Sequence, residues 1–297
     1  MNSKEHIGSF YAILSGFLYG FLGYFGMSVI HSGMSPSTML FWRFLISSVV
    51  MLIVIFPTLK RISDSKYDLL ITFLGGAGFY SLSTLLYFIA AGYIGSGLAM
   101  VIFFTYPVIL MVINYFLFRQ TIPAPYYLAI IMILVGMTLL VDWHEMRMDL
   151  IGIAFGLVSA FFYAGYLALS KQIQASPNMS AFMLSSGCSV AFLLFSLFQG
   201  SFIIPTQYSV WANLIGVGII STAVPILLLL YSLKLISSDK AAILSVLEPV
   251  FVVIFGFILL GETLYLKHVI GITIVLSGAL LTLFSHKIKI PRIQAAQ

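Results

Sequence analysis

The chain has 297 residues, of which 61% are hydrophobic and 8% are charged, and its mean hydropathy is +1.11. A soluble domain carries about 25% charged residues, so this composition excludes a water-soluble globular protein and places most of the surface in lipid. The net charge of +5 does not indicate nucleic-acid binding, because the basic residues lie between apolar segments, where lysine and arginine set membrane orientation.

Apolar segments long enough to cross a bilayer follow one another along the whole chain. A crossing takes about 20 residues in a helix, and helices satisfy their own backbone hydrogen bonds in lipid. The first segment is too long for the apolar part of a signal peptide, so we expect it to stay in the mature protein. In chain order, the predicted transmembrane helices are 7–30, 38–56, 68–91, 95–118, 125–142, 150–171, 179–199, 209–233, 239–260 and 266–285.

The placement of Lys and Arg predicts the orientation of these helices. With the N-terminus inside, 11 of the 14 Lys and Arg residues lie on the cytoplasmic side of the membrane. Positive residues are enriched in cytoplasmic loops. We therefore expect a multi-pass protein of the bacterial inner membrane with both termini in the cytoplasm.

The second half of the chain repeats the first. A shift of 142 residues places Pro107 on Pro249, Thr121 on Thr263 and Gly136 on Gly278. Each half holds five predicted helices, and an odd number means that the halves enter the membrane from opposite sides. This is an inverted repeat, which is common in secondary transporters. The predicted units are residues 1–145 and 146–297.

Two short motifs near the end of the chain resemble those of a known family. Leu247-Glu248-Pro249-Val250 and Leu260-Gly261-Glu262-Thr263 look like the closing signature of the EamA family, in the drug/metabolite transporter superfamily. The first half carries a weaker copy, Tyr106-Pro107-Val108, and departs from the pattern at Arg119-Gln120. The resemblance implies an all-α fold of ten transmembrane helices around a central cavity that opens alternately to each side. It does not name the substrate.

Glu248 is an acidic residue deep in a predicted span. It lies about nine residues into the ninth helix, or roughly 13 Å at helical rise, and an ionised group at that depth costs several kcal/mol. One interpretation is a site for proton coupling or for a substrate amine. The other is a neutral or hydrogen-bonded carboxyl that holds the helix bent at Pro249.

Arg43 in the second helix also has two interpretations. It could bind a substrate carboxylate with two parallel hydrogen bonds, or it could snorkel to the outer interface or cap neighbouring carbonyls. We favour the structural role.

Polar and aromatic residues recur at helical spacing in several spans. Ser159, Tyr163 and Tyr166 share one face of the sixth helix, and Tyr80 and Tyr87 share one face of the third. Such faces either pack between helices or line one cavity with aromatic rings and hydroxyl groups. The full set of residues that we expect to bind substrate is Tyr19, Trp42, Arg43, Tyr80, Tyr87, Tyr106, Tyr163, Tyr166, Ser245 and Glu248.

These features predict a secondary transporter that exports a small metabolite or amino acid by alternating access, with proton coupling through Glu248 as an option. The alternatives are an uncoupled exchanger or facilitator of a nucleotide-like or methylated metabolite, and a channel or scaffold subunit. The chain lacks the phosphate-binding loop and the metalloprotease and serine-hydrolase motifs, so we do not expect an enzyme. With Cys188 as the single cysteine, we expect no metal site and no cofactor.

Overall fold

Two Ser-Pro steps show how the sequence sets the beginnings of spans. Helix α3 (Pro36–Ile55) begins at the proline after Ser35, and helix α10 (Pro177–Phe198) begins at the proline after Ser176. Proline suits the first helical position, where its missing N–H has no partner to lose. The Ser35 side chain also accepts from the Thr38 backbone N–H, which caps α3.

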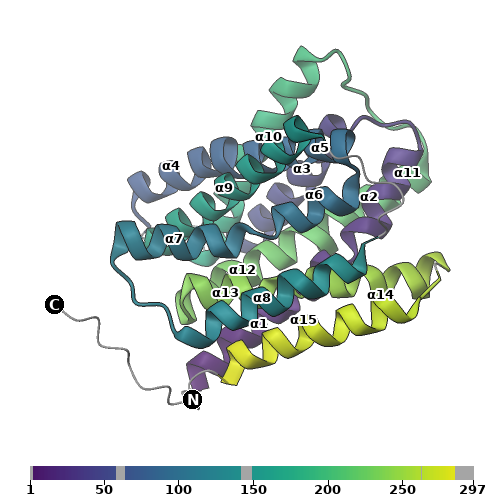
Figure 1. Cartoon of the computed structure of the whole chain (residues 1–297). Helices are drawn as coiled ribbons and strands as arrows, with labels where there is room; N and C mark the ends of the chain where they lie inside the picture. The colour runs from purple at the N-terminus through teal and green to yellow at the C-terminus, as the bar shows by residue number, and fades with distance from the viewer. Residues whose placement is uncertain (1–2, 58–63, 142–148, 262, 285–297) are drawn as a thin grey trace.

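The computed structural model describes residues 3–57, 64–141, 149–261 and 263–284, and these residues form helices without any strand (Figure 1). Nine of their helices or helix pairs are long and apolar enough to cross a membrane, and α8 is a shorter apolar helix. This confirms the ten predicted helices. The predicted boundary at 145/146 and the motif residue Glu262 lie outside the described residues.

The ten spans, in chain order, have the following bounds. They are α1 (Ser3–Tyr19) with α2 (Leu22–His31); α3; α4 (Lys66–Gly75), the π-helical turn η2 (Gly76–Tyr80) and α5 (Ser81–Ile94); α6 (Ser96–Phe103) with α7 (Tyr106–Phe118); α8 (Ala124–Leu140); α9 (Leu150–Gln172); α10; α11 (Tyr208–Gly218), the π-helical turn η4 (Ile219–Ala223) and α12 (Val224–Leu235); α13 (Ser238–Ser245) with α14 (Glu248–Leu260); and α15 (Leu266–Phe284). Spans 1, 3, 4, 8 and 9 are thus interrupted.

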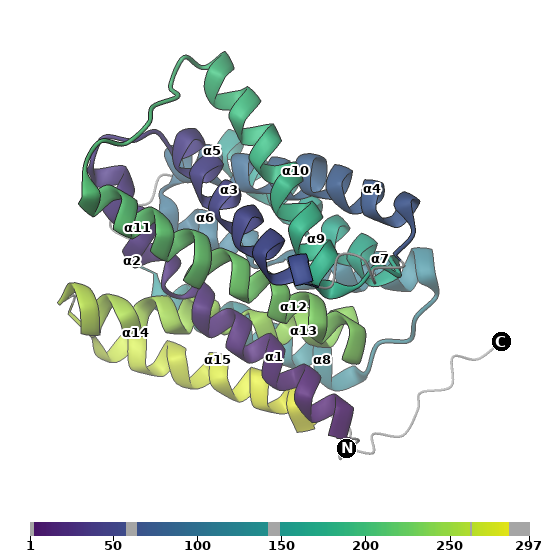
Figure 2. The same ribbon diagram turned by 180° about the vertical axis from the view of Figure 1, so that it is seen from behind.

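The beginning of α1 and the end of α15 lie at the same end of the bundle, as Figures 1 and 2 show. We call this end the terminal face, and the other end, where α2 ends and α3 begins, the opposite face. Odd-numbered spans run from the terminal face to the opposite face, and even-numbered spans run back.

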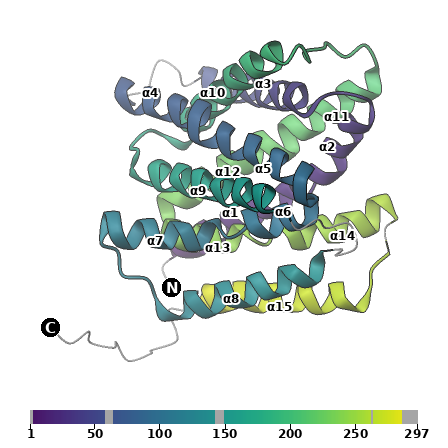
Figure 3. The ribbon, with the colours of Figure 1, turned by 45° about the horizontal axis from the view of Figure 1, so that its top comes forward.

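The helices pair as an inverted repeat requires. Helix α8 packs along α15, α3 along α10, α5 along α9 and α1 along α12. Exchanging the two halves turns the α5–α9 pair into the α12–α1 pair and maps the other two pairs onto themselves. Figure 3 shows α8 and α15 side by side at one edge of the bundle.

Glycines allow the α8–α15 pair to approach closely. A Cβ added to Gly136 would lie 2.8 Å from the Gly271 carbonyl O, and a Cβ added to Gly271 would lie 2.7 Å from the Gly136 carbonyl O. Small residues at such crossings are the usual means by which helices associate in lipid. This crossing holds the fifth and tenth spans together away from the centre of the bundle.

The two π-helical turns occupy equivalent places in the two halves, 143 residues apart. In a π-helical turn the backbone hydrogen bonds shift from i→i+4 to i→i+5. The Ser81 hydroxyl donates to the Gly76 O at 2.8 Å, and the Thr222 hydroxyl donates to the Val217 O at 2.7 Å. Both turns lie at the centre of the bundle, beside the cavity described next.

Candidate substrate-binding cavity

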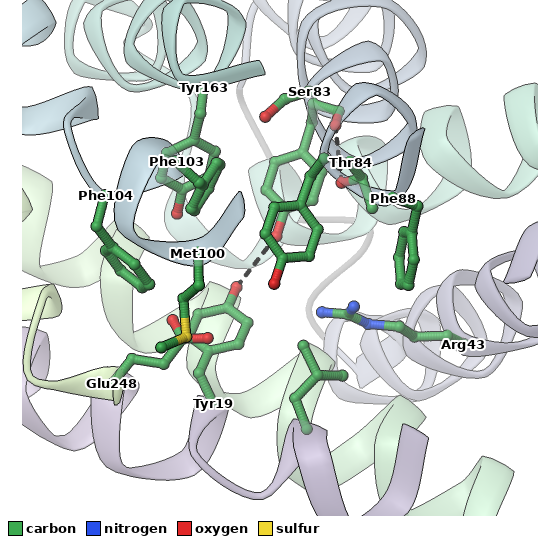
Figure 4. Close-up of a pocket in the computed structure, with 13 residues that line it drawn as sticks. Tyr19, Arg43, Ser83, Thr84, Phe88, Met100, Phe103, Phe104, Tyr163 and Glu248 are labelled. Atoms are coloured by element: carbon green, nitrogen blue, oxygen red, sulfur yellow. Dashed lines mark hydrogen bonds between the residues drawn. The ribbon is translucent and has the colours of Figure 1, made fainter. Parts of the chain in front are cut away.

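A cavity of about 130 Å³ lies in the middle of the bundle, where the interrupted spans meet (Figure 4). A cavity of about 150 Å³ is enough to bind benzene in another protein, so this one has room for a solute of about that size. All its lining residues lie at midspan or nearer the opposite face. They are Tyr19, Leu22, Arg43, Tyr80, Ser83, Thr84, Tyr87, Phe88, Met100, Phe103, Phe104, Tyr163 and Glu248.

Glu248 is the first residue of α14 and extends into this cavity. Pro249 follows it and has no N–H to donate to the preceding turn, so span 9 is interrupted at Val246 and Leu247. The carboxyl therefore lies at the N-terminus of a half-helix, where the helix dipole favours negative charge. Among the described residues it has no hydrogen-bond or ion-pair partner, which leaves it available to a solute or a proton.

Arg43 reaches the cavity from α3 and is 4% exposed. Its Nε donates to the Thr222 Oγ1 at 2.6 Å, its Nη2 donates to the Ser221 O at 3.4 Å, and its guanidinium lies 5.1 Å from the Phe44 ring centroid. The side chain thus fastens α3 to the π-helical turn η4. These two bonds use two of its five N–H donors, so the same guanidinium can also bind a solute.

The tyrosines that line the cavity come from spans 1, 3 and 6. The hydroxyl oxygens of Tyr19 and Tyr80 lie 3.4 Å apart, and the Tyr80 ring packs edge-on against Tyr163 and Tyr166. Spans 3 and 6 are also joined by reciprocal bonds in which the Ser83 and Ser159 hydroxyls donate to each other's backbone carbonyls, at 2.9 and 2.7 Å. These bonds hold spans 3 and 6 together beside the cavity, into which the tyrosines bring hydroxyl groups.

Six of the ten predicted binding residues line the cavity, and the other four lie elsewhere. Trp42 turns toward the opposite face, where its Nε1 donates to the Ile203 O at 3.1 Å. Tyr166 lies behind Tyr80, and Tyr106 lies behind Tyr163 with ring centroids 4.7 Å apart. The Ser245 hydroxyl donates to the Ala241 O of its own helix at 2.8 Å.

Several lining residues could not be predicted from their residue type alone. Leu22, Met100, Phe103 and Phe104 are apolar residues in a chain that is apolar throughout. Their common feature is that each lies close to an interruption in span 1 or span 4. An interruption exposes side chains that a continuous helix would pack against its neighbours, and this signal could have identified them.

Polar contacts close the bundle between the cavity and the terminal face. The Asn114 side chain of α7 donates to Asp239 Oδ1 at 2.7 Å and to Ser238 Oγ at 2.9 Å on α13. The buried Lys240 forms an ion pair with Glu5 of α1 at 2.6 Å. Asp239 and Lys240 do not line the cavity. The cavity is therefore separated from the terminal face and displaced toward the opposite face.

Comparison with known proteins places this architecture in a family. The EamA-like transporter family matches residues 6–142 and again residues 150–284. An "Uncharacterized transporter" of Archaeoglobus fulgidus is 35% identical over 132 residues, which cover 44% of this chain and 47% of that protein. One of Clostridium kluyveri is 24% identical over 296 residues, 94% of each chain.

A solved crystal structure extends the comparison to the fold. It has a TM-score of 0.81 at 16% sequence identity and covers 98% of this chain and 100% of its own. Identity this low supports the fold alone. The two family matches cover nearly the whole length of the sequence and coincide with the two five-span halves. The chain therefore belongs to the EamA-like transporter family.

Proposed function

We propose that this membrane transporter is a secondary carrier that exports a small zwitterionic metabolite, such as an amino acid, by alternating access through the central cavity. The observation that carries the proposal is that Arg43 and Glu248 line the same cavity from different helices and, among the described residues, form no ion pair with each other. A solute carboxylate would bind the guanidinium, and its ammonium group would bind the carboxylate.

The remaining lining residues limit what such a solute can be. Phe88, Met100, Phe103 and Phe104 form an apolar wall, which suits a small aliphatic side chain. Because the cavity is closed toward the terminal face, a solute would enter or leave it from the opposite face in this conformation. We further propose that the terminal face is cytoplasmic, because Lys66, Lys171, Lys234 and Lys240 lie near it.

A second candidate is an uncoupled exchanger of a nucleotide-like or methylated metabolite. It is favoured by the ring faces of Tyr80 and Tyr163, whose centroids are 5.7 Å apart and which could pack against a flat heterocycle. Under this alternative Arg43 would have its structural role only, through Thr222 and Ser221.

Counterflow in proteoliposomes tests both candidates and the channel alternative. Vesicles preloaded with an unlabelled mixture of amino acids should accumulate labelled amino acid transiently, and the rate should saturate with concentration. Accumulation of labelled purine or methylated metabolite without amino-acid counterflow would favour the second candidate. Flux that does not saturate would overturn carrier function.

A further inference from the structure

The fourth and ninth spans are interrupted at equivalent points, but their surroundings differ. A shift of 142 residues places Tyr106 on Glu248 and Met100 on Ala242. Toward the terminal face, α7 packs on α13, and the Tyr106 hydroxyl donates to the Ala242 O at 3.2 Å. Toward the opposite face, Glu248 and Met100 both line the cavity, and no hydrogen bond joins the Glu248 carboxyl to α6 among the described residues.

An inverted-repeat carrier opens to its other side by moving one repeat against the other around a fixed site. If the halves exchange conformations in that movement, Glu248 takes the place in its half that Tyr106 now has in the other half. The Met100 carbonyl then lies where Glu248 could donate to it, as the Ala242 carbonyl now accepts from Tyr106. A phenol can donate to a carbonyl, but an ionised carboxylate only accepts hydrogen bonds. Glu248 can therefore reproduce the Tyr106 contact only when it carries a proton.

We propose that the cavity closes toward the opposite face when the Glu248 carboxyl, protonated from that side, donates to the Met100 carbonyl. This inference rests on the proposed alternating-access function. A solute ammonium has three N–H donors, so it can bridge the Glu248 carboxylate and the same carbonyl. Proton and solute then compete for one group, and closure toward the opposite face requires one or the other.

The closure at the terminal face has bonds that the opposite closure cannot reproduce. Asn114 donates to Ser238 and Asp239, whereas the shift of 142 residues places Gly256 on Asn114 and Gly97 on Asp239. These glycines have no side chain to donate or accept. The state open to the opposite face is therefore favoured until Glu248 is protonated or binds an ammonium group.

The other titratable groups around Glu248 keep their charge when it changes. They are the Arg43 guanidinium on α3 and the phenols of Tyr19 on α1, Tyr80 on η2, Tyr87 on α5, Tyr106 on α7 and Tyr163 on α9. Guanidinium and phenol groups ordinarily do not titrate between about pH 5 and about pH 8. Because Asp239 and the Lys240–Glu5 ion pair lie at the terminal-face closure, the Glu248→Gln variant decides whether a conformational change in that interval reports the Glu248 carboxyl.

Two nearly isosteric cysteine reporters can follow the movement, each placed in a Cys188→Ser background. Thr84→Cys lies in the cavity wall, nearer the opposite face. Ser245→Cys is buried now, but its repeat counterpart Phe103 lines the cavity, so Ser245 should become accessible when the terminal face opens. The ratio of the two maleimide labelling rates removes the effect of pH on thiol reactivity that the two sites share, and the same ratio in the Glu248→Gln variant measures what remains.

We expect the Ser245→Cys to Thr84→Cys ratio to rise at least roughly fivefold as pH falls from about 8 to about 5, the shift that one hydrogen bond supports. Glu248→Gln supplies a neutral N–H donor and should keep the high ratio at both pH values. Tyr106→Phe removes the terminal-face donor, so its ratio should rise roughly fivefold at each pH and keep its pH dependence. A ratio that does not change with pH overturns the inference. So does a ratio in the Glu248→Gln variant that changes with pH as much as it does with Glu248 in place.

Counterflow measured in the same vesicles separates this inference from the proposed function. Saturable counterflow with a pH-independent ratio overturns the role of Glu248 as the switch and leaves the carrier intact. A pH-dependent ratio without saturable counterflow supports the switch and overturns the proposed carrier function.

Discussion

The two halves of the chain share one architecture but contribute different chemistry to the cavity. Span 2 of the first half supplies Arg43, and the equivalent position in span 7, found by aligning Ser35-Pro36 with Ser176-Pro177, is Leu184. Span 9 of the second half supplies Glu248, and its equivalent in span 4 is Tyr106. Each half thus provides one charge, from a position that is uncharged in the other half. The repeat builds the cavity, and its departures from symmetry give the cavity its polarity.

A second difference concerns the spans that face each other across the cavity. Helix α9 runs unbroken from Leu150 to Gln172, whereas the first span is interrupted after Tyr19. A Cβ on Gly20 would lie 2.6 Å from the Phe251 Cβ of α14, so the glycine at this interruption lets the first span approach the half-helix that begins with Glu248. The unbroken α9 instead packs along α5 and carries Tyr163. The interrupted first span therefore packs against the half-helix that carries the acidic group.

The charge that distinguishes Glu248 from Tyr106 should have the largest effect on transport. Replacing Glu248 by Gln keeps the size of the side chain and removes the charge, so transport efficiency should fall about 10- to 100-fold, as for loss of a hydrogen bond to a charged group. Folded yield by size-exclusion chromatography should fall much less. Asp149→Asn is a matched control, because Asn caps α9 as well as Asp does. Full transport by the Glu248 variant at every pH would contradict the assignment.

The α8–α15 glycine crossing is alike in the two halves, so substitution of either glycine should reduce stability by a similar amount. Gly136→Ala and Gly271→Ala each place a methyl group against a backbone carbonyl, and each should reduce the free energy of unfolding by about 1–3 kcal/mol. Thermal unfolding in detergent measures the effect. Gly92→Ala, whose added Cβ meets nothing within 4 Å, should change the melting temperature little. Unequal losses at Gly136 and Gly271 would show that the crossing is not symmetric in energy.

Arg43→Lys distinguishes the binding role of Arg43 from its structural role. Lysine keeps the positive charge but loses the planar pair of donors, so the apparent affinity for a carboxylate-bearing solute should weaken about tenfold, equivalent to ~1.4 kcal/mol. Concentration dependence of counterflow measures it. Unchanged apparent affinity would leave Arg43 with only its contacts to Thr222 and Ser221.

Substitutions in the two π-helical turns should differ in their effect on stability, by a smaller amount than the effects above. Thr222→Val removes both the bond to the Val217 carbonyl and the acceptor for Arg43, whereas after Ser81→Ala the Gly76 carbonyl still accepts from Cys188. We expect the first variant to lose about 1 kcal/mol more stability than the second, measured by thermal unfolding. Thr273→Val, on an exposed face with one local bond, is the control. Equal losses would mean that the Arg43 contact adds nothing.

The transmembrane spans could be predicted from the sequence because lipid imposes a simple requirement on it. Each span must be apolar over the thickness of the bilayer and must pair its own backbone groups, and both demands are local. The matching prolines Pro107 and Pro249 likewise predicted equivalent features in the two halves, because a proline disturbs its own helix wherever that helix is placed.

What only the tertiary structure decided is which side chains meet at the centre. Trp42 and Arg43 are neighbours in the sequence, yet one turns toward the opposite face and the other reaches the cavity. Successive residues of a helix point in directions about 100° apart, so an apolar chain with weak amphipathicity does not reveal which face turns inward. That choice depends on contacts between spans far apart in the sequence, such as Arg43 with Thr222, and these exist only once the two halves have packed together.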